Sequence, residues 1–89
     1  MTTKALEKAW TKLVYDAGYD DDISCSPNMS RLGPYYANVD RLAQEREAEL
    51  RPLIAAAKAA EAGRSHYAEG IEAALERAIA TPRQWPIHA

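Results

Sequence analysis

The chain has 89 residues and carries a formal net charge of -2 at pH 7. This balance excludes the broad basic surface by which proteins bind nucleic acid or anionic membranes in general, and leaves room only for a local basic patch. Hydrophobic residues make up 47% of the chain, but alanine is the largest contributor and phenylalanine is absent. Since a domain of this size buries only about 60–65% of its unfolded surface, we expect a thin core, and therefore a homo-oligomer or a protein partner.

The cysteine content and the apolar runs bound the cellular context. The lone Cys25 excludes an intrachain disulfide and a clustered-cysteine zinc site, and it fits a reducing compartment. No apolar run approaches the roughly 20 residues that cross a bilayer, and residues 1–12 lack the apolar core of a signal peptide. We therefore expect one cytoplasmic domain over residues 1–89 with no membrane segment.

The first predicted element is an amphipathic helix over residues 3–17. Its apolar positions recur with helical spacing and are Leu6, Ala9, Trp10, Leu13, Val14 and Ala17. Thr2 or Thr3 can cap its start, and Gly18 can end it.

The opposite face of this helix carries Lys4, Lys8 and Lys12, spaced by four residues, with Tyr15 projecting among them. One interpretation is a solvated face, since charged stripes on helices usually face water. The other interpretation is a contact surface for an acidic partner, in which Tyr15 supplies an aromatic anchor.

Residues 18–33 lose helical periodicity and are predicted to form an irregular loop. The loop begins with Tyr19 and continues with an acidic run, Asp20, Asp21 and Asp22. Loops of this length are uncommon in small domains and are often functional, so we expect this one to contact a partner. The acidic run with Asp16 could attract a hard cation, but it lacks the glycine and closing glutamate of a calcium loop, and no metal site is predicted.

A long helix is predicted over residues 34–62, with Pro34 in the first position, where proline is tolerated. Its apolar arc consists of Tyr35, Tyr36, Val39, Leu42, Ala43, Leu50, Leu53, Ile54 and Ala57. Pro52 lies inside this pattern and predicts a kink, because its ring crowds the carbonyl of Ala48. The arc keeps its phase across Pro52, which favours one kinked helix closed by Gly63, with two abutting helices as the alternative.

Arg46 is a charged residue near the middle of this apolar arc, where an unpaired charge is costly. In one interpretation its methylene stem packs while the guanidinium reaches water or a carboxylate. In the other it joins a buried contact across an oligomer interface or binds an anionic ligand. Tyr35 and Tyr36 lie beside the predicted loop, where they could line a groove.

The last predicted helix spans residues 65–80, with Ser65 as its cap and Thr81-Pro82 as its stop. Its apolar arc is Tyr67, Ala68, Ile71, Ala74, Leu75, Ala78 and Ile79, and its flank carries Glu69, Glu72 and Glu76. His66 and Glu69 share a face but give only one copy of a di-metal motif, in reversed order, so a surface histidine is expected. The tail, residues 81–89, is predicted to be extended, with Trp85 docked on the domain rather than free as a recognition peptide.

These elements predict an all-α fold, a small three-helix antiparallel bundle with a long kinked central helix and an irregular loop between the first two helices. The chain is not expected to be an enzyme. Cys25 and the serines lack a base and an orienting group at a recognisable spacing, and the isolated glycines form no phosphate-binding loop. Neither a cofactor nor a metal is predicted.

The leading functional hypothesis is a non-catalytic protein-interaction module that occludes or bridges a larger partner, in one specific form a phage or mobile-element inhibitor of a host defence protein. The predicted partner-binding residues are Lys4, Lys8, Lys12, Tyr15, Tyr19, Asp20, Asp21, Asp22, Tyr35, Tyr36, Arg46 and Trp85. One alternative is a sponge for a small anionic ligand or nucleotide at a homo-oligomer interface. A further alternative is a DNA-binding accessory protein that uses the first helix, although nucleic acid is the less expected partner.

Overall fold

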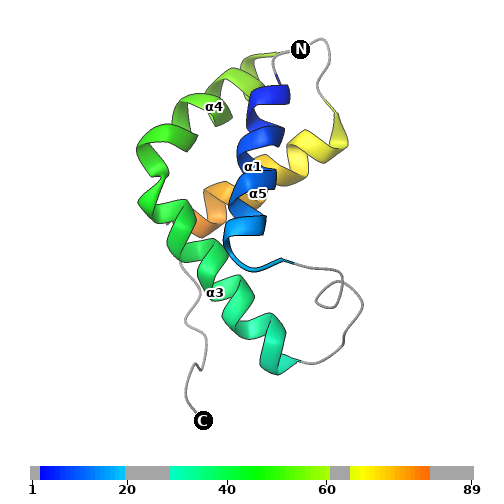
Figure 1. Ribbon diagram of the computed structural model, residues 1–89. Coiled ribbons are helices and arrows are strands. Elements are labelled where there is room, and N and C mark those ends of the chain that lie inside the picture. The colour runs from blue at the N-terminus through cyan, green and yellow to red at the C-terminus, as the bar shows by residue number, and fades with distance from the viewer. Residues whose placement is uncertain (1–2, 20–28, 61–64, 81–89) are drawn as a thin grey trace.

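The three-dimensional structure is a computed structural model that describes residues 3–19, 29–60 and 65–80. Within these ranges the chain forms four α-helices and no β-strand (Figure 1). The helices are α1 (Lys4–Asp16), α3 (Met29–Glu45), α4 (Glu47–Ala59) and α5 (His66–Ala80). The predicted all-α class is therefore confirmed. The predicted three-helix bundle is wrong, because the long central helix is in fact two helices, α3 and α4.

The end of α1 is a glycine-based cap, as the sequence predicts. Gly18 adopts a φ of 108°, which residues with a side chain rarely adopt. The N–H of Gly18 donates to the carbonyl of Tyr15 (3.1 Å), and the N–H of Tyr19 donates to the carbonyl of Val14 (3.0 Å). These two bonds form a Schellman motif, and they carry Tyr19 back over the last turn of α1.

The start of α3 lies five residues before the predicted position, so the predicted loop over residues 18–33 is wrong for residues 29–33. Pro34 is the sixth residue of α3 and not the first. At this position proline removes one hydrogen bond, and its ring crowds the carbonyl of Ser30, four residues earlier. The additional turn places Leu32 against the hydrophobic core, and this apolar burial offsets the local cost.

The break between α3 and α4 falls at Arg46, upstream of the predicted kink at Pro52. Arg46 has φ -101° and ψ 15°, outside the helical range, whereas Pro52 lies inside α4. The N–H of Arg46 still donates to the carbonyl of Leu42 (2.9 Å), and the Arg46 carbonyl accepts from Leu50 (2.8 Å). The predicted kink at Pro52 is wrong: the proline ring crowds the carbonyl of Ala48, within α4, and the chain opens six residues before Pro52, at Arg46. The two abutting helices, the alternative from the sequence, are the observed arrangement.

The start of α5 is capped by Ser65, as predicted. The N–H of Ala68 donates to the Ser65 Oγ over 3.1 Å, and this bond satisfies a first-turn donor that has no partner within the helix. The end of α4 at Ala59 comes before the predicted end at residue 62. Gly63 and the tail with Trp85, whose roles the sequence also predicts, lie outside the described residues.

The core lies where the four described helices meet, and each of them contacts the other three. α3 and α4 form a bent arm, and α5 crosses behind α1 (Figure 1). The largest fully buried side chains are those of Leu6, Leu13, Leu50 and Leu75. Asn38 of α3 donates from Nδ2 to the Ala17 carbonyl (3.1 Å), and Gln44 donates from Nε2 to the Ala78 carbonyl (3.2 Å). α3 thereby satisfies carbonyls at the ends of both α1 and α5.

The predicted apolar arcs are buried or half-buried with one exception, Tyr67, which is 57% exposed. Two acidic side chains are also buried, Asp40 and Glu72. The sequence places Glu72 on a polar flank, so its burial is a correction that only the packing of α5 against the other helices reveals. Over residues 3–19, 29–60 and 65–80, no helix is long and apolar enough to cross a membrane.

Candidate functional site

The surface between α1 and the first turns of α5 is hollowed, and we call it the α1–α5 groove. Two hollows adjoin along it and share Thr11 and Tyr67. The first, the aromatic hollow, has a volume of about 330 Å³ and is lined by Trp10, Thr11, Val14, Tyr15, Tyr19, Tyr35 and Tyr67. The second, the lysine hollow, opens more widely to solvent over about 860 Å³ and is lined by Lys4, Glu7, Lys8, Thr11, Lys12 and Tyr67.

The aromatic hollow is built where the end of α1 meets α3. The turn at Gly18 brings Tyr19 against Tyr15, with ring centroids 5.9 Å apart and ring planes at 81°. Tyr19 also contacts Tyr35 of α3 at 6.1 Å, and Tyr35 contacts Tyr36 at 5.2 Å. Aromatic contacts of this kind stabilise a structure beyond the area that they bury. The tyrosine cluster therefore fixes the rings that line this hollow.

Tyr35 is the buried member of the tyrosine cluster. Its removal from water raises the pKa of its hydroxyl to about 12, and the neighbouring Tyr36 and Tyr19 add to this shift. Tyr35 is therefore neutral at physiological pH. Tyr15, which contacts the cluster through Tyr19, is 62% exposed and offers its ring to a binding partner.

The lysine hollow takes its charge from one face of α1. The spacing of four residues places Lys4, Lys8 and Lys12 along one side of the helix. The Nζ of Lys12 lies 3.3 Å from Oδ2 of Asp16, so this lysine is partly neutralised. Within the part of the chain that the structure describes, Lys4 and Lys8 form no ion pair. Their charge is available to a ligand.

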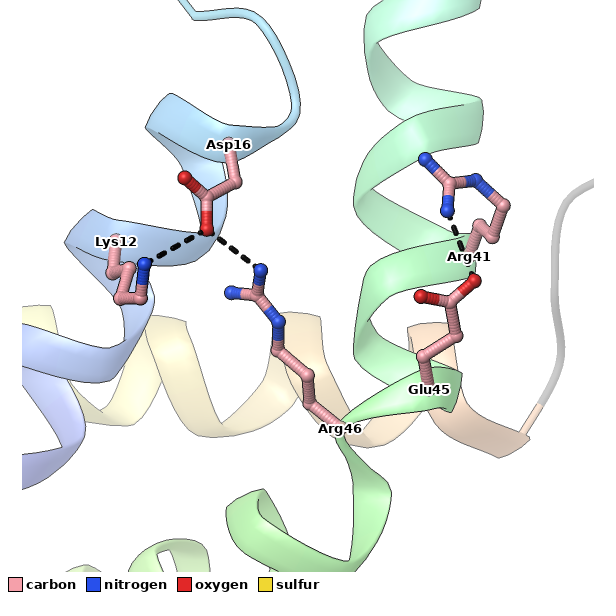
Figure 2. Close-up of polar contacts among 5 residues, drawn as sticks. All are labelled: Lys12, Asp16, Arg41, Glu45 and Arg46. Atoms are coloured by element: carbon pink, nitrogen blue, oxygen red, sulfur yellow. Dashed lines mark hydrogen bonds and ion pairs between the residues drawn. The ribbon is translucent and has the colours of Figure 1, made fainter.

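Asp16 joins the lysine face to the break between α3 and α4 (Figure 2). Its Oδ2 accepts a hydrogen bond from Nη2 of Arg46 over 2.6 Å and a second bond from Lys12. The bond from Arg46, followed by that from Lys12, holds the pKa of the Asp16 carboxyl below its ordinary 3.8. The Arg46 side chain is 25% exposed, so it packs in part while its guanidinium meets a carboxylate, the first interpretation from the sequence. Arg41 and Glu45 form a separate ion pair on α3 (Figure 2).

The structure brings part of the predicted partner-binding set together in the groove. The residues that line it are Lys4, Lys8, Lys12, Tyr15, Tyr19 and Tyr35. Tyr36 packs against Tyr35 and lines neither hollow, and Arg46 is engaged by Asp16. The remaining predicted residues, Asp20, Asp21, Asp22 and Trp85, lie outside the described residues.

Trp10 and Tyr67 line the groove although both belong to apolar arcs, for which helical spacing predicts core positions. Trp10 packs against the core from one side and lines the aromatic hollow from the other. Both residues also line a smaller hollow of about 270 Å³ beside His66 and Gly70. The position of Tyr67 in the first turn of its helix, at the edge of the apolar arc, is the signal that could have indicated exposure.

The chemistry that the groove offers is binding by shape, aromatic surface and positive charge. Among the described residues, no group of three or more histidine, cysteine, aspartate or glutamate side chains is placed to hold a metal ion. His66 lies near the groove, and its Nδ1 is 3.1 Å from Oε1 of Glu69. No protein-family model, no curated protein and no solved structure matches the chain. What the groove can bind is therefore inferred from its own residues.

Proposed function

We propose that the chain is a non-catalytic protein-binding module that occludes a segment of a larger partner in the α1–α5 groove. The observation that carries the proposal is the exposure of two tyrosines beside open hollows, 62% for Tyr15 and 57% for Tyr67. Tyrosine and tryptophan are enriched among the residues that dominate interface energies. Their large rings also bury much area at a low cost in conformational entropy.

The groove stands on helices that pack against one another, which supports a binding role. α1 and α5 contact each other, and each of them also contacts α3 and α4. The fully buried Leu6 and Leu13 anchor the inner face of α1. A surface that is already ordered loses little freedom when a partner binds, so more of the interaction energy appears as affinity. Such a module acts by covering its partner, and it could thereby inhibit or bridge a larger protein.

Affinity capture tests this proposal. The tagged chain, its Tyr15→Ala and Tyr67→Ala variants and an Arg41→Ala control are incubated with the same cell lysate. Arg41 lines none of the three hollows and pairs with Glu45 on α3, so the control leaves the groove intact. We expect the parent chain and the Arg41→Ala control to retain the same protein. Each tyrosine variant should bind that protein about tenfold more weakly. A capture pattern that is the same for all four chains, or no captured protein, contradicts the proposal.

A small-anion site is a second candidate, favoured by Lys4 and Lys8 of the lysine hollow, which form no ion pair with any described residue. The volume of this hollow is in the range of small-ligand sites, but its wide opening leaves much of a small ligand in water. Native mass spectrometry of the purified chain distinguishes the two candidates. A bound anion of constant mass that the Lys8→Glu variant loses supports the anion site, and a bare chain favours the protein-binding module.

A further inference from the structure

We infer that the α1–α5 groove binds an acidic protein segment that also carries an apolar side chain. The carboxylates of this segment lie at the lysine hollow, and its apolar side chain enters the aromatic hollow. This inference rests on the proposed function and assigns one partner chemistry to it. It follows from two surfaces of different character that adjoin at Thr11 and Tyr67.

The lysine hollow sets the sign of the partner's charge. Lys4 and Lys8 are without an ion pair among the described residues, whereas Lys12 is engaged by Asp16. Glu7 also lines this hollow and reduces its positive charge without reversing it. Because Lys4 and Lys8 lie one helical turn apart, they match two carboxylates at a similar spacing. Charge complementarity of this kind speeds association and selects against basic segments.

The aromatic hollow sets the second requirement, an apolar anchor. Among the described residues, its lining contains five aromatic rings and no side chain with a formal charge at neutral pH. Tyr15 and Tyr19 stand almost at a right angle to each other and form two of its walls. Aromatic walls can also bind a cation, but the lysines of the adjoining hollow repel one. A leucine or phenylalanine side chain meets no such repulsion.

Single-stranded nucleic acid also binds to lysines and aromatic rings, so it is the main competing occupant. A nucleic-acid strand needs positive charge along the whole track of its backbone. Here the lysines are gathered in one hollow with Glu7 among them, while the described residues of the adjoining hollow carry no charge. The net charge of the chain is -2. The charge distribution therefore favours a short acidic peptide segment over a nucleic acid.

Fluorescence of Trp10 provides the test, because this residue lines the aromatic hollow. The chain has two tryptophans, so a Trp85→Phe variant leaves Trp10 as the only source of tryptophan emission. The probes are a short helical peptide of glutamate and leucine, the same peptide with glutamine in place of glutamate, and oligothymidylate. We expect the glutamate peptide to change the emission and to bind about tenfold more tightly than the glutamine peptide, since two surface ion pairs contribute. Lys8→Glu removes this preference, and the matched charge reversal Arg41→Glu leaves it unchanged.

Three results would overturn the inference. They are equal binding of the glutamine peptide, equal or tighter binding of oligothymidylate, and the absence of an emission change with the glutamate peptide. The proposed function fails by a separate result, in which Tyr15→Ala and Tyr67→Ala capture the same partners as the parent chain. Peptide binding that needs Tyr67 but ignores Lys8 rejects the acidic partner alone. Circular dichroism of each variant confirms that the helices are retained.

Discussion

The two faces of α1 have opposite physical properties. Its inner face is closed, with Leu6 and Leu13 at 0% exposure against the other helices. Its outer face is open, with Lys4 and Lys8 exposed and Tyr15 62% exposed. The inner face of α1 therefore stabilises the fold, and its outer face offers a contact surface. A substitution is expected to change stability on the inner face and binding on the outer face. Stability and binding measurements on matched variants can separate the two.

The largest expected effect comes from opening the inner face. Leu13→Ala removes a fully buried side chain, and we expect it to lower the free energy of unfolding by about 2–5 kcal/mol, because a cavity remains. Lys8→Ala, on the outer face of the same helix, should change it by less than about 0.5 kcal/mol. Urea unfolding followed by circular dichroism measures both. Equal losses of stability in the two variants would show that the faces do not differ as described.

A smaller effect is expected at the start of α5, on the other side of the groove. Ser65→Ala removes the cap that bonds to the Ala68 N–H, and it should lower the free energy of unfolding by about 1 kcal/mol. The first turn of α5 also carries Tyr67, so loss of the cap should weaken binding of the glutamate–leucine peptide as well. Ser65→Asp, which keeps a capping oxygen, should retain both properties. A Ser65→Ala variant with full stability and full binding would contradict this coupling.

Alkaline pH tests the buried member of the tyrosine cluster, Tyr35. The folded-state pKa of Tyr35, about 12, lies above its ordinary value of 10.0. A raised pKa means that the folded state favours the protonated hydroxyl, so its contribution to stability is complete below pH 10 and is lost as pH rises toward 12. Absorbance titration should show one of the five tyrosines ionising near pH 12, and Tyr35→Phe should remove that step. Full ionisation of all the tyrosines near pH 10 with the fold intact would refute the prediction.

The smallest effect on stability is expected from Asp16→Asn, which weakens the links to Arg46 and Lys12. The depressed pKa of Asp16 means that its contribution is present above the ordinary 3.8 and is lost as pH falls through the lower folded-state value. The variant should therefore be slightly less stable than the parent at neutral pH and equal to it in strong acid.

The same variant should affect the outer face in the opposite direction. Release of Lys12 adds positive charge to the lysine hollow, so the glutamate–leucine peptide should bind somewhat more tightly to Asp16→Asn than to the parent chain. Fluorescence titration of Trp10 measures this change in the Trp85→Phe background. Weaker binding would show that Asp16 supports the groove rather than competing with the ligand for Lys12.

Local signals in the sequence determined the all-α class, the cap of α5 at Ser65 and the end of α1 at Gly18. They also determined which residues of α1 face the core and that the lysines share the opposite side. These features depend on residues within one or two turns of each other, where helical spacing and capping bonds act directly. The same local spacing explains why Lys4, Lys8, Lys12 and Tyr15 lie along the groove. Tyr35 reaches it only because α3 packs against the end of α1.

Only the tertiary structure decided where the central helix divides, how early α3 begins and which aromatic rings stay open. The helices begin and end at neither Pro34 nor Pro52. The observed boundaries go with the packing of Leu32 on the core and the bond between Arg46 and Asp16, and both contacts join residues that are distant in sequence. Tyr67 and Trp10 have the spacing of core residues, yet they line the groove because α1 and α5 leave hollows beside them. Periodicity assigns a side chain to a face, but the position of the neighbouring helix decides whether that face is covered.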